Sequence, residues 1–397
     1  MNKKTSGILA EKREFENAHL PKRRNVLLLP STKTLGKTTA LMETRHYITM
    51  AIAAILLQLL LALFVHRLNW LGNVQGKHRW LLGVALFLSV NAIVLTTPLR
   101  LYADDFRVSA LILVLLIYSA FASLLVSLLQ RFLPCLRNKL KAIYLLSFAA
   151  LIGWSLYNAY TPMVRHYEIT LDKPMQPLRI GVASDLHLGK LFGGNQLDQL
   201  AQIMNEQKVD IILLPGDIMD DNVNAYLAEK MQPHLAKLHA PLGVYATLGN
   251  HDFFGDEQRI EQEIRAAGII PLKDESLLID NRFTLVGRND DLVSDRPSTT
   301  QLIQHAAPNL PIILMDHRPT DIEQHAKLPV DIQISGHTHN GQVFPNNLIV
   351  KFMYRLSNGY EKIGNGHFFV TSGYGFWGVP FRLGSQAEVV VIDVKGK

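Results

Sequence analysis

The sequence predicts an α-helical membrane region followed by a layered α/β domain with mixed β-sheets. Four long apolar runs occupy the first 160 of the 397 residues, and short apolar runs alternate with amphipathic segments in the rest. Charge divides the chain at the same place. Residues 1–160 hold 19 Lys and Arg against 6 Asp and Glu, a net charge of +13, whereas residues 161–397 hold 21 against 28, a net charge of −7. We therefore expect a basic, disordered tail over residues 1–45, four transmembrane helices over 46–160 and an α/β domain over 161–397.

Each apolar run in the first part is close to the roughly 20 residues that cross a hydrocarbon core of about 30 Å. The runs lie at residues 47–65, 80–99, 108–129 and 143–160, and none contains a charged side chain. Four such runs in succession would leave a soluble fold without a polar face. We expect a multi-pass membrane protein with both termini on one side. Lys and Arg flank the two sides in nearly equal numbers, so the positive-inside rule leaves the side of the α/β domain open.

The second part of the chain alternates predicted strands and helices. Leu197, Leu200, Ile203 and Met204 repeat at helical spacing, and residues 226–238 offer a second helix. Strand-like apolar runs lie at residues 180–183, 211–214, 244–248, 283–286, 312–315, 332–334, 367–371 and 388–392. This alternation predicts an α/β layered domain with a mixed sheet or a pair of sheets.

Five short polar motifs directly follow five of these strands. They are Ser184-Asp185-Leu186-His187, Gly216-Asp217-Ile218-Met219-Asp220, Gly249-Asn250-His251-Asp252, Asp316-His317-Arg318-Pro319 and Gly336-His337-Thr338-His339. If the strands are parallel strands of one sheet, all five motifs emerge at the carboxyl edge, where open α/β sheets place their sites. The side chains at that edge can bind metal, so the sequence predicts a metal site there.

The donor set indicates which ions fit. Carboxylate and imidazole ligands suit borderline divalent ions such as Mn²⁺, Fe²⁺, Co²⁺ or Zn²⁺, and the absence of thiolates argues against a structural zinc site. Four His with two Asp and one Asn exceed the needs of one tetrahedral ion. Two ions about 3.5 to 4 Å apart, bridged by a carboxylate, would use them all, and such a pair activates a water and neutralises charge on a transferring phosphoryl group.

In their order and spacing, the five motifs resemble the calcineurin-like metallophosphoesterases, whose pattern is D-x-H, G-D-x-x-D, G-N-H-[DE], a separate His and G-H-x-H. The resemblance covers about residues 178–395 and implies a metal-dependent phosphoric ester hydrolase. It also implies roles for individual residues. Asp185, His187 and His339 would hold one ion, Asn250, His317 and His337 the other, Asp217 would bridge them, His251 would protonate the leaving oxygen or steady its charge, and Asp220 and Asp252 would orient imidazoles or backbone.

Residues 335–342 and 372–382 resemble the membrane-associated branch of that superfamily. The branch includes transmembrane proteins with a metallophosphoesterase domain and bacterial enzymes similar to UDP-2,3-diacylglucosamine pyrophosphatases. The resemblance implies a bacterial inner-membrane location and a phosphoester substrate that is lipid-linked, such as UDP-2,3-diacylglucosamine. The apolar and basic stretch at residues 344–356 is either a rim of the active site that enters the headgroup zone or part of the core.

Other functions remain open at this point. The substrate could be a soluble nucleotide or a phosphoprotein, and a non-catalytic membrane receptor could use the same fold. A transporter is disfavoured because the spans hold no ionisable residue to mark a pathway. Nucleic acid is not an expected partner because the α/β domain is acidic, and the single cysteine, Cys135, allows no disulfide within the chain.

Overall fold

The computed structural model describes residues 32–99 and 105–397. The chain divides into two compact units, residues 1–59 and 60–397. The described residues of the first unit form the N-terminal part of one helix, α1 (Thr32–Leu71). This helix begins inside the stretch predicted as a disordered tail, because adding residues to a helix that already exists costs less free energy than starting a new one. The rest of the predicted tail, residues 1–31, lies outside the described residues.

Four helices within the described residues are long and apolar enough to cross a membrane, as the sequence predicts. These stretches are Ala51–Leu71, Gly76–Thr96, Phe106–Phe132 and Pro134–Tyr160. They belong to α1, α2 (Gly76–Leu99), α3 (Asp105–Phe132) and the pair formed by η1 (Pro134–Lys139) and α4 (Leu140–Tyr160). Two buried hydrogen bonds join α3 to α4, at 2.5 Å between Tyr118 Oη and Ser155 Oγ and at 2.7 Å between Ser119 Oγ and Tyr144 Oη. These bonds fix α3 against α4 in an otherwise apolar contact.

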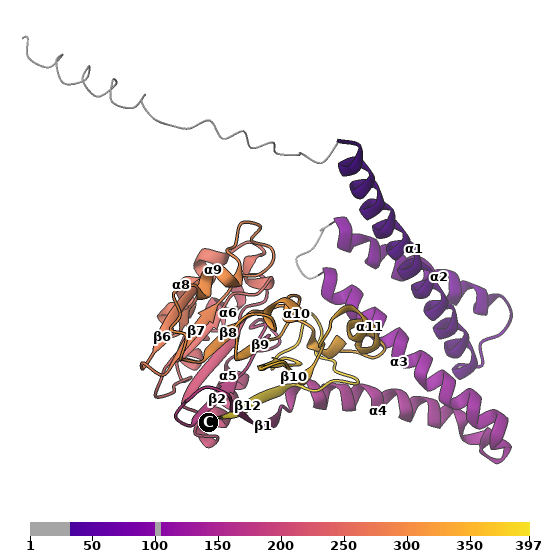
Figure 1. The fold of residues 1–397 in the computed structure, drawn as a ribbon. Helices are drawn as coiled ribbons and strands as arrows, with labels where there is room; N and C mark the ends of the chain where they lie inside the picture. Colours follow the sequence, from indigo (N-terminus) through magenta and orange to yellow (C-terminus); the bar gives the residue numbers. More distant parts are fainter. Residues whose placement is uncertain (1–31, 100–104) are drawn as a thin grey trace, which may run out of the picture. The chain divides into compact units, whose positions relative to one another are not determined.

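The strands after α4 form two six-stranded sheets (Figure 1). The first sheet has the order β1-β12-β2-β3-β4-β5, with bounds β1 Met163–Leu171, β12 Glu388–Gly396, β2 Leu178–Val182, β3 Ile211–Pro215, β4 Val244–Thr247 and β5 Ile270–Pro271. The second has the order β10-β11-β9-β8-β7-β6, with bounds β10 Gly359–Ile363, β11 Gly366–Val370, β9 Ile332–Ser335, β8 Ile312–Met315, β7 Phe283–Gly287 and β6 Glu275–Ile279. The strands predicted from the sequence all occur.

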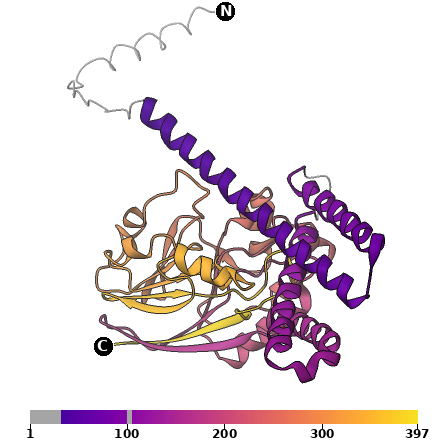
Figure 2. The same ribbon diagram turned by 90° about the vertical axis from the view of Figure 1, so that its right-hand side faces the viewer.

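Both sheets are mixed, as expected. In the first, β2 to β5 are parallel, β12 runs antiparallel to β2, and β1 runs parallel to β12 from Met163 opposite Glu388 to Leu171 opposite Gly396 (Figure 2, magenta beside yellow). In the second, β7, β8, β9 and β11 are parallel, with β6 and β10 antiparallel at the edges. In each sheet the central parallel strands therefore end toward one edge: β2 to β5 in the first sheet, and β7, β8, β9 and β11 in the second.

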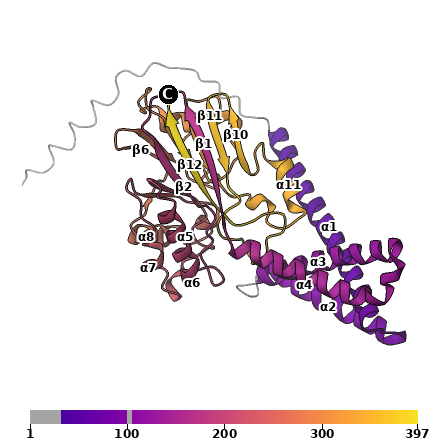
Figure 3. The same ribbon diagram turned by 90° about the horizontal axis from the view of Figure 1, so that it is seen from below.

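The two sheets pack face to face, and helices cover their outer faces. Along β3, Ile211 and Leu213 belong to the cluster between the sheets, whereas Ile212 and Leu214 belong to the cluster under the helices. This alternation follows from the two-residue period of a strand. The helices are α5 Gly194–Glu206, α6 Asn224–Ala228, α7 Gln232–Leu235, α8 Glu257–Ala266, α9 Thr299–Ile303, α10 Ile322–His325 and α11 Asn346–Met353, with 3₁₀ turns η2 His251–Phe253 and η3 His339–Gly341. Helices α5 to α8 lie together over the first sheet (Figure 3).

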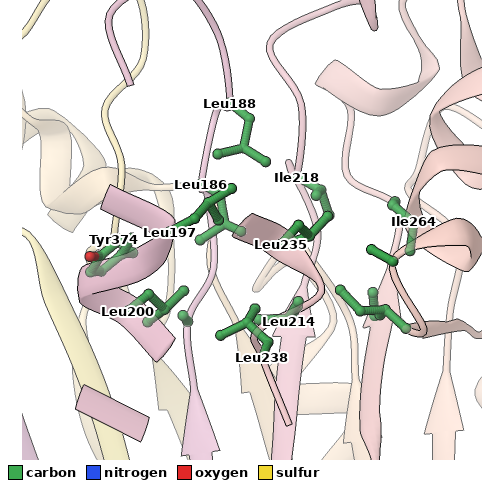
Figure 4. Packing of buried hydrophobic residues seen from close by; sticks show 14 of the residues in the cluster. Leu186, Leu188, Leu197, Leu200, Leu214, Ile218, Leu235, Leu238, Ile264 and Tyr374 are labelled. Carbon is green, nitrogen blue, oxygen red and sulfur yellow. The ribbon is translucent and has the colours of Figure 1, made fainter. Parts of the chain in front are cut away.

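Leucine and isoleucine side chains fill the layer between the first sheet and its helices (Figure 4). Leu197 and Leu200 of α5 and Leu235 of α7 meet Leu214 of β3 and Ile264 of α8 in one buried cluster. The predicted helix spacing at residues 197–204 is thus confirmed. The single helix predicted at residues 226–238 is wrong: the chain forms α6 and α7 with a break between them. Pro233 lies in the first turn of α7, and in the interior of one continuous helix it would lack a donor and clash with the preceding turn.

Candidate metal centre and active site

The five polar motifs come from two sheets and not from one. The strands β2, β3 and β4 of the first sheet and β8 and β9 of the second each end directly before one motif. The single parallel sheet considered for them is therefore corrected to a pair of sheets. Because the sheets pack face to face with these carboxyl edges together, the motifs still meet at one place. The backbone bond from Gly336 N to His317 O, at 2.9 Å, and that from Asp185 N to Gly216 O, at 3.0 Å, tie neighbouring motifs.

The first group of side chains contains Asp185, His187 and His339, whose ligand atoms lie within 4.8 Å of one another. The Nε2 atoms of His187 and His339 are 3.1 Å apart, and His339 Nε2 is 3.5 Å from Asp185 Oδ1. All three residues are buried. Two imidazole nitrogens and a carboxylate oxygen therefore face a common point.

The second group contains Asp217, His317 and His337, again within 4.8 Å. His317 Nδ1 lies 2.8 Å from the carbonyl oxygen of Pro215, to which it donates, so Nε2 is left to face Asp217 Oδ2 at 3.2 Å. The Asn250 side chain is buried nearby, and its Oδ1 has no hydrogen-bond partner. The second group thus offers imidazole, amide and carboxylate donors.

Asp217 lies between the two groups. Its Oδ2 is 3.2 Å from His317 Nε2 and 3.7 Å from His187 Nε2, and its Oδ1 accepts the backbone N–H of His251 at 2.9 Å. Burial opposes ionisation, but the nearby His317 and His187 outweigh it and hold the pKa of Asp217 well below its ordinary value. Asp217 thus faces one histidine of each group.

The buried donors fit a pair of divalent cations. Among the described side chains of the cluster, His317 Nε2 and Asn250 Oδ1 are buried without a hydrogen-bond partner, and buried polar atoms normally have one. Burial lowers the pKa of His317, but Asp217 and Asp185 outweigh burial and raise it to about 10. Burial and the charge of His317 lower the pKa of His337 to about 3. A cation among these donors would supply the positive charge that the carboxylates attract.

The turns that carry these residues have left-handed backbone conformations. The φ angle is +54° at Asp185, +44° at His187, +53° at Asp217, +69° at His337 and +49° at His339. Such conformations cost of order 1 to 3 kcal/mol each for residues other than glycine, and they concentrate at functional sites. The folded surroundings must therefore hold these turns in place.

Two motif glycines, Gly249 and Gly336, provide space for the carboxylates of neighbouring motifs. A Cβ atom on Gly336 would lie 2.1 Å from Ser184 Oγ and 2.3 Å from Asp185 Oδ2, and one on Gly249 would lie 2.2 Å from Asp217 Oδ1. Neither glycine has a positive φ angle, unlike Gly216 at +89°. The close approach of backbone to the carboxylates explains why side chains larger than hydrogen do not fit there.

The buried carboxylate of Asp252 organises two of these turns. Its Oδ2 accepts backbone N–H groups of Gly249 at 2.9 Å and Ile218 at 3.1 Å, and its Oδ1 accepts that of Met219 at 2.9 Å. Asp252 therefore contacts backbone N–H groups. Asp220 instead faces an imidazole, because its Oδ1 lies 3.6 Å from His187 Nδ1.

His251 lies at the edge of the cluster with its ring paired to a carboxylate that the sequence analysis did not select. Its Nδ1 lies 2.5 Å from Oδ1 of Asp221, the residue directly after Asp220. A protonated Nδ1 donates in this pair, so Nε2 remains for contact with substrate. The consecutive aspartates at positions 220 and 221 were a signal for this partner.

Asp316, in contrast, does not join the cluster, because its carboxylate pairs with Arg288 at 2.6 Å.

Arg382 is another residue whose role the sequence analysis missed. Its guanidinium is completely buried, donates to the carbonyl oxygens of Gly375 at 2.6 Å and Ser372 at 2.8 Å, and places Nη2 3.2 Å from His339 Nδ1. Burial lowers its pKa to about 10. Burial, followed by the charges of His187 and Arg382, holds the pKa of His339 well below its ordinary value. Arg382 therefore orients the turn at residues 372–375 through these carbonyl oxygens.

A cavity of about 530 Å³ extends from the cluster to the membrane helix α3. Asp217, Asn250, His251, His337 and His339 line one part of it. Apolar side chains line the other part: Ala110, Leu113, Val114 and Ile117 of α3, Ile349 and Val350 of α11, and Val379. The cavity therefore joins the polar cluster to apolar walls.

Helix α11, which follows the last motif, is exposed. None of its residues is buried, and Phe352 is 91% exposed, Met353 66%, Ile349 53% and Leu348 49%. The alternative that this stretch packs into the core is therefore wrong for α11. An exposed apolar helix beside the cavity is typical of a surface that contacts a membrane or another apolar partner.

Comparison with known proteins agrees with this geometry. The family model "Calcineurin-like phosphoesterase" matches residues 178–341. An uncharacterized metallophosphoesterase of Aquifex aeolicus is 31% identical over 261 residues, which cover 63% of this chain and 98% of that protein. One from Helicobacter pylori is 28% identical over 67% of this chain and 74% of its own length. A transmembrane protein with metallophosphoesterase domain from Bos taurus is 26% identical over 58% of this chain and 56% of its own length.

Proposed function

Because this chain belongs to the calcineurin-like metallophosphoesterases, we propose that it is a multi-pass enzyme of the bacterial inner membrane that hydrolyses a lipid-linked phosphoester or pyrophosphate. Metal-dependent hydrolysis of phosphoric esters is the chemistry of the family. The proposal adds the substrate class, for which UDP-2,3-diacylglucosamine is one example, and the residues that act on it.

The observation that carries the proposal is the cavity shared by the cluster and α3. A phosphoryl group beside Asp217 and His337 would have its substituent against Leu113, Val114 and Ile117, which belong to a candidate membrane span. Burial of a side chain or acyl group on such walls contributes about 25 cal/mol per Å² of apolar surface. A lipid can therefore reach the cluster while its chain stays in apolar surroundings.

Helix α11 supports the same substrate class. Phe352 and Met353 are the most exposed apolar residues of this helix, and Lys351 lies between Val350 and Phe352 in the sequence. An apolar face with a basic neighbour suits the headgroup zone of a bilayer with anionic lipids. The acidic net charge of residues 161–397 also disfavours free polyanions at long range.

The proposed roles of the residues follow from their positions. Asp185, His187 and His339 would hold one divalent ion, Asn250, His317 and His337 a second, with Asp217 shared; Mn, Fe, Zn and Co all suit these donors. When bound, two such ions supply an activated water and neutralise charge on the phosphoryl group.

His251 would act on the leaving group. Its Nδ1–H donates to Asp221, so the imidazolium form of the ring would carry a second proton on Nε2 and give it to the leaving oxygen as the bond between phosphorus and that oxygen breaks, leaving a neutral ring with its proton on Nδ1. The backbone N–H of His251 meanwhile fixes Asp217. The Val114 and Ile117 side chains on the far wall exclude water from the apolar part of the cavity.

We expect Leu113→Gln to reduce hydrolysis of a long-chain phospholipid substrate by about ten-fold or more, because about 1.5 to 3 kcal/mol of apolar contact is lost there. Activity on a small soluble chromogenic diester should persist. Leu111→Gln is the matched control, since Leu111 is exposed on the same helix but does not line the cavity. Initial rates of the full chain in nanodiscs on both substrates measure the effect.

Two outcomes would contradict the proposed substrate class. One is an equal rate for lipid and for its short-chain soluble analogue with the same headgroup. The other is a preference for lipid that Leu113→Gln leaves unchanged. High activity on a nucleotide or a phosphoprotein alone would assign the enzyme to a soluble substrate.

A further inference from the structure

The membrane helix α3 contacts the metal cluster through Arg107. The Arg107 guanidinium forms an ion pair with Asp220 Oδ2, and Asp220 Oδ1 faces His187 Nδ1 at 3.6 Å. We propose that Arg107 is a positioning residue for His187, so that the end of a membrane helix sets the affinity of the first metal site. The inference rests on the metal-binding part of the proposed function and not on the identity of the substrate.

His187 needs a carboxylate on its second nitrogen. Its Nε2 faces His339 and Asp217, which leaves the proton on Nδ1, and Nδ1 is buried without a hydrogen-bond partner. A ligating imidazole normally directs its other N–H to a carboxylate or carbonyl that fixes the tautomer and the ring plane. Asp220 is the carboxylate that faces this nitrogen.

Asp220 in turn needs a cation to hold it there. Its side chain is only 10% exposed, and a buried carboxylate is costly without a partner of opposite charge. Asp220 also belongs to a group with His187 and His251 whose ligand atoms lie within 4.8 Å. Because Arg107 occupies Oδ2, the Asp220 carboxylate stays directed at His187 and does not bind an ion itself.

The residue before Arg107 fixes the position of this part of α3. The Phe106 ring packs on Trp377 with centroids 4.4 Å apart. A Cβ atom on Gly378 would lie 2.8 Å from the Phe106 ring, so only glycine allows this approach. The Trp377 ring lies 6.1 Å from that of His251. The start of α3 is thus packed against the turn that borders the active site, and Arg107 approaches Asp220 from a defined direction.

The experiment measures metal affinity. Full-length protein in nanodiscs is stripped of metal and titrated with Mn²⁺ by calorimetry, and ions per chain are counted by mass spectrometry. We expect Arg107→Gln to weaken one of the two Mn²⁺ affinities by roughly 10- to 100-fold. This is the usual effect of removing a residue that orients a metal ligand. Arg107→Lys should be intermediate because it keeps the charge but loses the planar fork.

Two further variants test whether Arg107 acts through Asp220. Asp220→Asn should weaken the same site, and the double variant should be no weaker than the weaker single variant, as for residues that act in one chain of contacts. The matched control is Arg259→Gln, which removes an ion pair with Asp256 on the exposed face of α8. That variant should bind Mn²⁺ like the wild type.

Wild-type Mn²⁺ affinity in Arg107→Gln would overturn the inference. A lower thermal midpoint with unchanged affinity would also overturn it, because Arg107 would then act on stability alone. If Arg107→Gln does not fold, Arg107→Lys and Asp220→Asn carry the same comparison. Absence of bound ions in the wild type would instead contradict the proposed function.

Discussion

Replacing Asp217 with asparagine is expected to abolish turnover and to lower metal content at the same time. The Asp217 Oδ2 atom lies 3.2 Å from His317 Nε2 and 3.7 Å from His187 Nε2, one histidine from each group. The asparagine amide is neutral and has a single, weaker oxygen donor. It therefore neither offsets the charge of two cations nor gives each of them a ligand. Both sites should therefore weaken together.

The measurement is the number of ions per chain by mass spectrometry, with kcat on a chromogenic phosphodiester. Asp198→Asn is the matched control because Asp198 pairs with His234 and Lys237 at the surface. Full activity with two bound ions in Asp217→Asn would show that Asp217 does not bridge them.

Replacing His251 with alanine is expected to lower kcat roughly 10²- to 10⁴-fold, the usual contribution of general acid catalysis, while both ions stay bound. The reason is that the His251 ring is held by Asp221 through Nδ1 and has Nε2 free for the leaving oxygen. The loss should shrink for esters with very good leaving groups, which need no proton. Asp221→Asn should cause a smaller loss in the same direction.

Metal analysis distinguishes this role from ligation. His251 belongs to a group with His187 and Asp220 that could hold a cation, so loss of an ion from His251→Ala would make it a ligand. If the loss of kcat does not depend on the leaving group, His251 has only an electrostatic role.

Local patterns were sufficient to predict the long apolar helices, the strands and the residues that lie close together after them. A strand buried on both faces reads as a short apolar run, and the residue after its carboxyl end lies at the sheet edge. Asp185, Asp217 and His337 could therefore be assigned to the carboxyl ends of their strands without knowledge of which strands pair. The same reasoning could not show that β8 and β9 belong to a second sheet, because pairing depends on contacts far apart in sequence.

The orienting residues were less accessible to sequence analysis. Arg107 lies 113 positions before its partner Asp220, in a segment whose composition indicates only a membrane helix. Arg382 stands 43 positions after His339 and is buried by the folding of the turn around it. The left-handed conformations at Asp185 and His187 are likewise imposed by tertiary contacts, since neither residue type requires a positive φ angle.

The most direct test of this account measures phosphoester hydrolysis and bound metal together in the purified full-length protein. Chelator-stripped protein in nanodiscs is titrated with Mn²⁺, and the rate on a chromogenic phosphodiester is plotted against ions bound per chain. We predict no hydrolysis without metal and full activity at two ions per chain, with a low rate at one. Hydrolysis that survives removal of all metal, or that reaches its maximum at a single ion, would contradict a two-ion site bridged by Asp217.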